Sequence, residues 1–280
     1  MLDSGPRITD DALRMRIRES NIIITGASSG IGRATALALA QSGANLVLAA
    51  RRAAELERVA EECRRTGVRC AVVPTDVSRQ DACESLIRTA TAELGPIDGL
   101  INNAGFAIFD RLETALLDDI RSMIETNFLG AVYCTRTVLP GMLERKRGAI
   151  VNVASISGLM GYESMGGYCA SKFAMVGFTE ALRNELMGRG VEVSLICPGT
   201  TDTPFFVTAE KGKIPGASRL ILAMSPEKVA AAIISAIERP VYRKIMPFTA
   251  AAFLRLKELS PRLAHLLMRR VSSFMPEKNR

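Results

Sequence analysis

Two side chains of complementary chemistry stand four positions apart in this sequence, the phenol of Tyr168 and the amine of Lys172. Residues at that spacing lie on the same face of a helix. A phenol titrates at about pH 10 in water, and a cation within about 4–6 Å lowers that pKa by favouring the phenolate. The pair therefore predicts general acid–base chemistry by Tyr168, with its pKa lowered by Lys172. A core tyrosine beside a solvated lysine is the alternative.

A serine hydroxyl is expected close to this pair. Ser155 stands thirteen positions before Tyr168 and follows the apolar run 149–153, which predicts a buried strand. In open α/β sheets, ligands bind at the carboxyl ends of the strands. We therefore expect Ser155 at the ligand edge of a sheet, where its hydroxyl can polarise a substrate carbonyl.

A glycine-rich segment follows the first apolar run of the chain. Residues 22–24 are three isoleucines, residues 25–32 read Thr-Gly-Ala-Ser-Ser-Gly-Ile-Gly, and residues 33–40 are rich in Ala and Leu. A strand, a glycine turn and a helix in this order place backbone N–H groups and a helix N-terminus against a pyrophosphate. An ordinary glycine loop is the alternative. The segment predicts a dinucleotide site that includes Gly26, Ser28, Ser29, Gly30, Ile31 and Gly32.

The second apolar run ends without an acidic residue. Residues 46–50 predict a strand whose end, in a dinucleotide fold, faces the adenosine ribose, where an acid binds the 2′-hydroxyl of NAD. Here Arg51 and Arg52 follow instead, and a guanidinium suits a 2′-phosphate. The sequence therefore favours NADP(H) over NAD(H). Two solvated arginines at the start of the next helix are the alternative.

Strands and helices alternate along the rest of the chain. This pattern predicts an α/β fold with one Rossmann-type, doubly wound parallel sheet and helices on both of its faces. Further strands are expected over residues 70–74, 97–101, 149–153, 191–197 and 242–247. Helices are expected over residues 53–66, 78–94 and 114–145, around the Tyr168 pair, and from residue 225.

Composition excludes several classes of function. No apolar run reaches the roughly 18 residues of a membrane span, and residues 1–20 lack the apolar segment of a signal peptide, so we expect a cytoplasmic protein. The six cysteines form no Cys-x-x-Cys pair and His265 is the single histidine, which argues against a metal site or a Ser-His-Asp triad. Residues 1–238 carry 26 Lys and Arg against 27 Asp and Glu, so no nucleic-acid partner is expected.

Several short motifs occur together, and their joint occurrence is far more specific than any one of them. Their order and separations resemble those of the short-chain dehydrogenase/reductase family, over roughly residues 20–247. The motifs are residues 25–32, the Asn-Asn-Ala-Gly of residues 102–105, Asn127, Ser155, Tyr168 with Lys172, and Pro198-Gly199.

The resemblance implies an oxidoreductase that interconverts a carbonyl and a secondary alcohol by hydride transfer. It implies that Tyr168 is the general acid or base, that Lys172 also holds the nicotinamide ribose, and that Ser155 bonds the reacting oxygen. By the same analogy Asn127 binds a water that relays protons to Lys172; a helix-distorting structural asparagine is the alternative. The implied cofactor contacts also include Asp76, Val77, Asn103, Ala104, Gly105, Pro198, Gly199, Thr201 and Thr203.

The substrate is expected to be an apolar, bulky alcohol or ketone: steroid-like, terpenoid or a long acyl chain. Residues 200–224 correspond to the variable substrate flap of the family, although its apolar residues also suit a lid that packs on the core. A 3-oxoacyl thioester reductase is the alternative enzyme, and an NADP-binding sensor or scaffold is the alternative outside catalysis. The expected pocket walls are Phe106, Leu159, Met160, Tyr162, Phe205 and Phe206.

The end of the chain departs from the common family pattern. We divide the chain into an N-terminal arm (1–20), the sheet domain (21–247) and an extension (248–280) expected to form about two short helices. Residues 239–280 carry 10 Lys and Arg against 2 Asp and Glu, and their apolar residues are spaced for an amphipathic helix. Such a helix suits peripheral contact with an anionic membrane, or packing on the body or on a second subunit. No glycine-rich strand end follows residue 247, so we expect a homodimer rather than the tetramer common in the family.

Overall fold

A seven-stranded parallel sheet forms the centre of the molecule, with strands in the order β3-β2-β1-β4-β5-β6-β7. The computed structural model of the chain describes residues 15–205, 223–263 and 266. The chain reverses its direction of progress between β1 and β4, and open sheets bind ligands at such a switch point. The strands are β1 (Asn21–Thr25), β2 (Asn45–Ala50), β3 (Cys70–Pro74), β4 (Gly99–Asn102), β5 (Gly148–Val153), β6 (Val191–Pro198) and β7 (Lys244–Met246).

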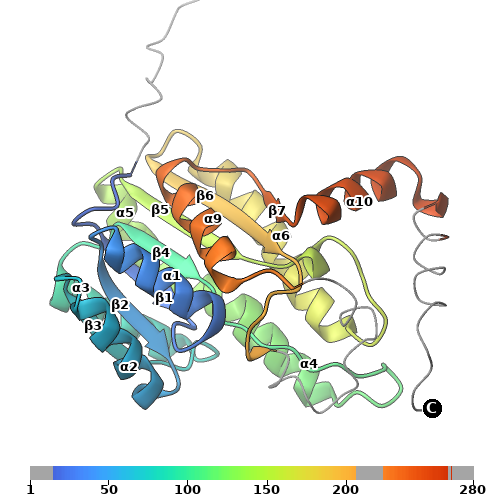
Figure 1. Cartoon of the computed structure of the whole chain (residues 1–280), viewed down its shortest axis with the longest axis horizontal. Coiled ribbons are helices and arrows are strands. Elements are labelled where there is room, and N and C mark those ends of the chain that lie inside the picture. Colours follow the sequence, from blue (N-terminus) through green and yellow to red (C-terminus); the bar gives the residue numbers. More distant parts are fainter. Residues whose placement is uncertain (1–14, 206–222, 264–265, 267–280) are drawn as a thin grey trace, which may run out of the picture.

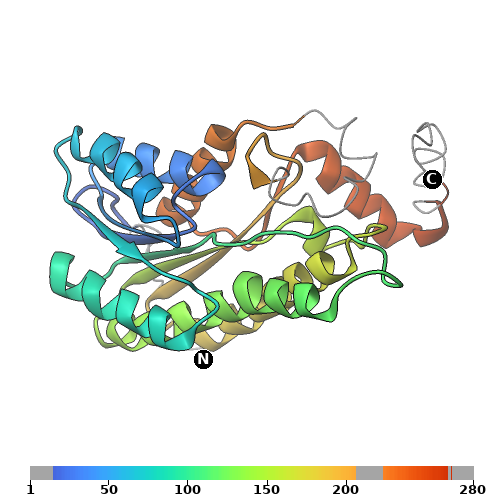
Figure 2. The ribbon, with the colours of Figure 1, turned by 90° about the horizontal axis from the view of Figure 1, so that it is seen from below.

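Helices cover both faces of the sheet, as Figures 1 and 2 show. One face carries α1 (Gly30–Gln41), α2 (Ala53–Arg64) and α9 (Pro226–Glu238), and the other carries α3 (Gln80–Leu94), α5 (Gly130–Glu144) and α6 (Gly166–Leu186). The remaining helices are α4 (Leu117–Ile124), which packs on α6, and α10 (Phe248–Leu259), with a π-turn η1 (Glu125–Leu129) and a 3₁₀ turn η2 (Ile156–Gly158). The predicted fold class is confirmed.

Burial on both sides explains why the strands are continuous apolar runs. Successive side chains of a strand point to opposite faces, so Ile22 and Ile24 pack under α1 and α9 whereas Ile23 packs under α3 and α5. All three isoleucines have no exposed surface. The centre of the sheet is therefore rigid, and its strand ends hold the following loops in fixed positions.

The helical stretch expected over residues 114–145 is helical without a break from Leu117 to Glu144, but a π-turn interrupts its α-helical form. Helix α4 gives way to the π-turn η1, and α5 begins at Gly130. A Cβ atom at Gly130 would lie 2.8 Å from the carbonyl oxygen of Val77, so a larger residue would push the helix away from the sheet edge. The π-turn carries Asn127, and π-turns occur often at functional sites.

The extension after the sheet begins with α10, which projects from β7 (Figure 1). Among the helices that the structure describes, none combines the length and apolar character needed to cross a bilayer. The second expected helix is described, and is helical, only at residues 261–263 and 266. Most of the predicted amphipathic stripe lies outside the described residues.

Candidate active site

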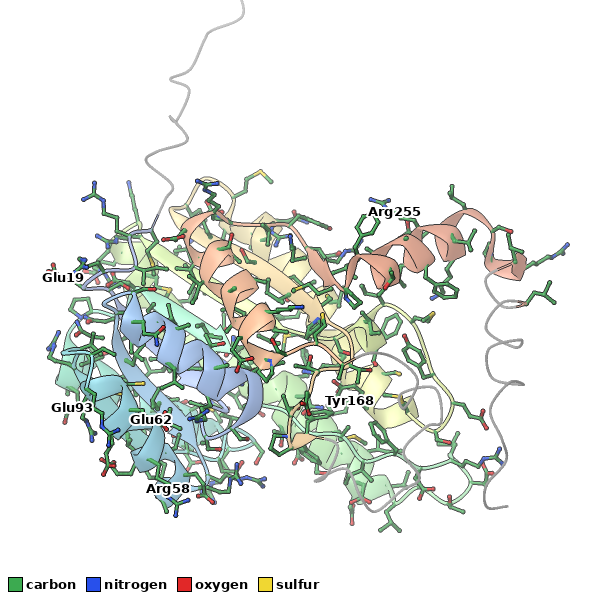
Figure 3. The ribbon with its side chains drawn as sticks, in the orientation of Figure 1. Glu19, Arg58, Glu62, Glu93, Tyr168 and Arg255 are labelled. Carbon is green, nitrogen blue, oxygen red and sulfur yellow. The ribbon has the colours of Figure 1, made fainter. Side chains whose placement is uncertain are left out.

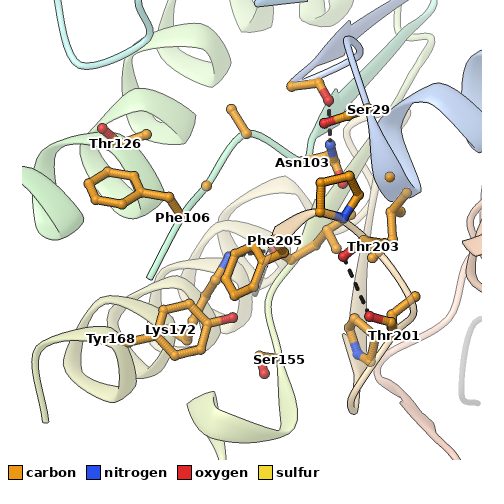
Figure 4. Close-up of a pocket in the computed structure, with 18 of the residues that line it drawn as sticks. Ser29, Asn103, Phe106, Thr126, Ser155, Tyr168, Lys172, Thr201, Thr203 and Phe205 are labelled. Carbon is orange, nitrogen blue, oxygen red and sulfur yellow. Dashed lines mark hydrogen bonds between the residues drawn. The ribbon is translucent and has the colours of Figure 1, made fainter. Parts of the chain in front are cut away.

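A cavity of about 480 Å³ lies at the carboxyl edge of the sheet, over the switch point between β1 and β4. It joins the glycine turn at one end to the Tyr168 pair at the other, and Figure 4 shows part of its lining. Most of the residues predicted to bind a cofactor line it. These are Gly26, Ser28, Ser29, Gly30, Ile31, Arg51, Arg52, Asp76, Val77, Asn103, Ala104, Gly105, Tyr168, Lys172, Pro198, Gly199, Thr201 and Thr203.

The glycines of the turn serve different purposes. A Cβ atom at Gly32 would lie 2.2 Å from the carbonyl oxygen of Gly26, so Gly32 lets α1 start directly against the turn and does not line the cavity. Gly26 has a φ of +66°, and a Cβ atom there would lie 2.8 Å from Cα of Ala104. Gly30 has a φ of +54°, and a Cβ atom there would lie 3.0 Å from the side chain of Thr203. The turn is thus held closed by its own packing, with backbone N–H groups at the helix start available to a phosphate.

Asn103 ties β4 to the glycine turn. Its side-chain amide donates hydrogen bonds to the carbonyls of Thr25 (3.0 Å) and Gly26 (3.3 Å), and its backbone N–H donates to the Thr25 hydroxyl (3.0 Å). The N–H of Ala104 donates to the same hydroxyl at 3.0 Å. These bonds fix the ends of β1 and β4, which flank the switch point. Asn103 therefore has two roles: it joins these strand ends and it lines the cavity.

Arg52 lies over the glycine turn. Its Nη2 donates to the hydroxyls of Ser28 (3.1 Å) and Ser29 (3.2 Å), while β2 ends in Ala50 and offers no carboxylate at this place. The guanidinium remains half-exposed and faces the cavity together with Arg51. This end of the cavity therefore presents hydroxyls and positive charge, a donor set that suits a phosphate.

Tyr168 and Lys172 lie on the buried side of α6, with 6% and 4% of their surface exposed. The Lys172 ammonium is 5.9 Å from the centre of the Tyr168 ring and donates a hydrogen bond to the carbonyl of Val153 at 3.1 Å. Ser155 directly precedes η2, and its hydroxyl is near enough to the Tyr168 phenol to lower the pKa of that phenol. Figure 4 shows these three side chains in one place. The β5 end and α6 thus bring together the residues that the sequence spacing predicted.

The direction of the Tyr168 pKa differs from our expectation. Burial raises the pKa of Tyr168 well above its ordinary value, and the nearby Ser155 hydroxyl lowers it only in part. Burial also lowers the pKa of Lys172 to about 8. The predicted lowering of the phenol pKa is therefore wrong for this state, because burial raises the pKa of Tyr168 more than the nearby Ser155 hydroxyl lowers it. At neutral pH Tyr168 is protonated and able to donate.

Asn127 is fully buried in η1 and does not line the cavity. Its Oδ1 accepts from the N–H of Phe106 (2.9 Å), and its Nδ2 donates to the Phe106 carbonyl (2.8 Å) and to the Ser171 hydroxyl (3.0 Å). These bonds clamp the chain after β4 onto α6, which is a structural role. A role in a water relay stays a prediction.

The substrate end of the cavity is aromatic. Phe106, Tyr162 and Phe205 line it as expected, and Tyr168 contacts Phe205 with ring centres 5.7 Å apart. Leu159 and Met160 do not line it: the turn η2 directs Leu159 into a cluster beneath β6, and Met160 is 9% exposed. Phe206 lies outside the described residues.

Sequence reasoning missed further wall residues. Phe109 packs edge-on against Tyr168 with ring centres 6.4 Å apart, and Met165 lies one helical turn before Tyr168. The spacing of Met165 from Tyr168 was a usable signal, whereas nothing in the sequence marked Phe109. The other unpredicted lining residues are Ala50, Thr75, Thr126, Val153, Ala154, Ile156, Ser157, Thr200 and Pro204.

Known proteins resemble this chain over most of its length. A family model described as short chain dehydrogenase matches residues 20–213. Ketoacyl reductase HetN of Nostoc sp. (strain PCC 7120) is 36% identical over 217 residues, which cover 78% of this chain and 75% of that protein. The uncharacterized oxidoreductase YxnA of Bacillus subtilis (strain 168) is 35% identical over 272 residues, 95% of this chain and 76% of that protein. Glycine betaine reductase ATRR of Emericella nidulans is 37% identical over 221 residues, but this chain spans only 17% of its length.

Solved structures share the fold. A short chain dehydrogenase/reductase from Burkholderia phymatum in complex with NAD superimposes with a TM-score of 0.81 and 30% identity, covering 89% of this chain and 96% of that chain. An alcohol dehydrogenase from the archaeon Thermococcus sibiricus, complexed with 5-hydroxy-NADP, superimposes with a TM-score of 0.71 and 28% identity. The match covers 81% of this chain and 94% of that chain. The two structures contain different dinucleotides.

Proposed function

This chain belongs to the short-chain dehydrogenase family, and we propose that it uses NADP(H) to interconvert a carbonyl and a secondary alcohol on an apolar, bulky substrate. One observation carries the proposal. The protonated phenol of Tyr168 and the hydroxyl of Ser155 lie on the wall of the cavity that also contains the glycine turn. The donors and the dinucleotide site therefore face one space.

The chain's own residues account for the proton chemistry. When bound, the dinucleotide supplies or accepts the hydride. During reduction, negative charge develops on the substrate oxygen, and Tyr168 donates its proton there while Ser155 donates a hydrogen bond. The Lys172 ammonium, 5.9 Å from the ring centre, stabilises the phenolate that this transfer produces. During oxidation the same groups act in reverse, with Tyr168 as the base.

The preference for NADP(H) follows from the adenosine end of the cavity. Arg52 is held over the turn by Ser28 and Ser29, Arg51 lines the same wall, and β2 ends without an acid. A 2′-phosphate would accept charge-assisted hydrogen bonds from these guanidiniums. A ribose without that phosphate would leave Arg52 to its contacts with Ser28, Ser29 and Glu55.

The preference for an apolar substrate follows from the other end of the cavity. Four aromatic side chains surround Tyr168 there, namely Phe106, Phe109, Tyr162 and Phe205. Aromatic walls favour a flat or bulky apolar body around the reacting carbonyl. No arginine or lysine other than Lys172 lines this end within the part of the chain that the structure describes, so we do not expect a carboxylate close to the reacting carbon.

A panel of ketones of graded size, assayed by NADPH and NADH oxidation, tests the proposal. We expect turnover to rise with the apolar size of the ketone and to be faster with NADPH. A protein that binds NADPH but converts no ketone or alcohol in the panel would contradict the proposal and would favour a sensor or scaffold.

A 3-oxoacyl thioester reductase is the second candidate. The similarity to a protein named ketoacyl reductase favours it, and an acyl chain suits the apolar walls. Acyl-carrier or CoA thioesters added to the panel separate the two candidates: the second requires that thioesters react faster than simple ketones of the same chain length.

A further inference from the structure

The position of the Ser155 hydroxyl depends on the short turn η2. Ser155 is the residue that caps this turn, in extended conformation, and its Oγ accepts a hydrogen bond from the N–H of Ser157 at 3.1 Å. The carbonyl of Ser155 accepts from Gly158 at 2.9 Å. A movement of η2 would therefore move the hydroxyl that is proposed to bond the reacting oxygen, together with Ile156 and Ser157 on the cavity wall.

One side of η2 has no freedom to move. A Cβ atom at Gly158 would lie 2.6 Å from the carbonyl oxygen of Lys172, so the turn rests directly on the backbone of α6. The N–H groups of Leu159 and Met160 both donate to the carbonyl of Ile156, at 3.0 and 3.1 Å. These bonds close the turn, but they do not attach its far end to the rest of the protein.

Two side chains do so: Cys169 of α6 donates from Sγ to the Met160 carbonyl at 3.8 Å, and the C-terminal extension adds a second attachment. Lys257 of α10, 98 residues along the chain, donates a hydrogen bond from Nζ to the carbonyl of Leu159 at 3.1 Å. Leu159 is the residue at which η2 ends, and a cation at a helix C-terminus is favourable because its carbonyls are unpaired and carry partial negative charge. Lys257 is partly buried, which limits the screening of this contact by solvent.

The start of α10 lies against the same region. The N–H of Gly199 donates to the carbonyl of Met246 at 2.6 Å, at the end of β7. A Cβ atom at Gly199 would lie 3.2 Å from Pro247 and 3.6 Å from the side chain of Ile156. The junction between β7 and α10 therefore adjoins η2 and the cavity wall, and Lys257 makes a second contact about two and a half turns along the helix.

We propose that Lys257 is a positioning residue for the reaction: its bond to the Leu159 carbonyl holds η2 between α6 and α10, and thereby fixes the direction of the Ser155 hydroxyl. The extension is in this way a part of the active-site scaffold. The effect on catalysis rests on the proposed function of Ser155.

Two full-length variants test the proposal, Lys257→Gln and the matched control Arg255→Gln. Arg255 is on the same helix, is 80% exposed and points away from the body of the protein (Figure 3), and its ion pair is with Glu258 of α10 itself. For Lys257→Gln we expect kcat with the best ketone to fall about threefold to tenfold, because a misdirected donor weakens the transition state. The Kd of Lys257→Gln for NADPH is expected to stay within about twofold of the parent value. Lys257→Arg is expected to keep most of the parent kcat, because arginine can donate to the same carbonyl.

A double-mutant cycle separates positioning from a general structural effect. In a Ser155→Ala background, Lys257→Gln is expected to lower kcat by less than about twofold, because the hydroxyl that it positions is gone. A full reduction in that background would overturn the proposal.

Amide hydrogen exchange provides a readout that does not depend on activity. The hydrogen-bonded amides of Gly158, Leu159 and Met160 are expected to exchange at least about tenfold faster in Lys257→Gln than in Arg255→Gln, with α2 unchanged as an internal reference. Equal exchange in the two variants overturns the proposal. If the parent protein converts no ketone, the proposed function fails, and the exchange rates alone then decide whether Lys257 holds the turn.

Discussion

Burial changes the pKa values of Tyr168 and Lys172 in opposite directions while their side chains stay together, with the ammonium 5.9 Å from the ring centre. Both changes favour the neutral forms of the groups. In the proposed reduction the phenol nevertheless loses its proton, and the adjacent ammonium stabilises the new phenolate only after the proton has left. The lysine contributes to the transition state more than to the resting state.

Tyr168→Phe is expected to lower kcat by about 10² to 10⁴, because the phenol is the proposed proton donor and the ring packing is preserved. NADPH is expected to bind nearly as tightly as before, since the glycine turn is untouched. Steady-state NADPH oxidation with a ketone and fluorescence titration with NADPH measure the two quantities. Tyr242→Phe is the matched control, because Tyr242 is 57% exposed and stacks on Arg183, away from the cavity. A near-normal kcat in Tyr168→Phe would remove this residue from the mechanism.

Lys172→Met is expected to inactivate the enzyme and yet to stabilise the fold at pH 7. Burial lowers the Lys172 pKa from 10.5 to about 8, so between these values the unfolded chain binds a proton that the folded protein does not. The free energy of unfolding therefore rises with pH through this window, and the full penalty of the buried charge remains below about pH 8. Removing the charge is expected to add about 1 kcal/mol at pH 7, after loss of the bond to the Val153 carbonyl is counted.

Urea unfolding at pH 7 and at pH 10 measures this effect. The gain in the free energy of unfolding caused by Lys172→Met is expected to shrink or reverse at pH 10. Lys228→Met, on the exposed side of α9, is expected to change the free energy of unfolding by the same amount at both pH values. A variant that is less stable than the parent at pH 7 would show that the charge is not a net cost there.

The sequence was most informative where burial on two faces leaves little choice. Residues 149–153 were predicted as a strand and form β5 with one residue more, Gly148, because an apolar run buried along its whole length has one stable arrangement. The four-residue spacing likewise placed Tyr168 and Lys172 on one side of α6, since helix geometry fixes that relation.

The errors arose where tertiary contacts decide the local structure. The π-turn at Asn127 depends on its bonds to Phe106 and Ser171, both far away in sequence. The orientation of Leu159 depends on the capped turn that starts at Ser155. The pKa of Tyr168 depends on the depth of its burial, which spacing alone does not reveal.

Gly32→Ala is expected to weaken dinucleotide binding at least about tenfold and to lower the melting temperature. An added Cβ atom would lie 2.2 Å from the carbonyl oxygen of Gly26, so the turn and the start of α1 must separate. Gly177→Ala is the matched control, because nothing lies within 4 Å of its added Cβ and it is within α6, where alanine is favoured over glycine by about 1 kcal/mol. NADPH titration and thermal unfolding distinguish the two variants; equal behaviour would mean that the turn tolerates a side chain.

Arg52→Ser is expected to raise the Kd for NADPH by about tenfold to a hundredfold and to change the Kd for NADH by less than about threefold. A hydrogen bond to a charged group contributes about 1.5–3 kcal/mol, and each 1.4 kcal/mol is about a factor of ten in affinity. Because Ser28 and Ser29 hold the guanidinium over the glycine turn, little ordering remains to be done when a phosphate arrives.

Arg58→Ser is the control for Arg52→Ser, since Arg58 is on the exposed outer side of α2 and lies outside the lining of the cavity (Figure 3). Its removal changes the net charge equally and is expected to leave both Kd values within about twofold. Raising the salt concentration is expected to weaken NADPH binding to the parent more than to Arg52→Ser, because one of the screened contacts is already absent. An unchanged ratio of the two Kd values in Arg52→Ser would contradict the assignment of this arginine to a 2′-phosphate.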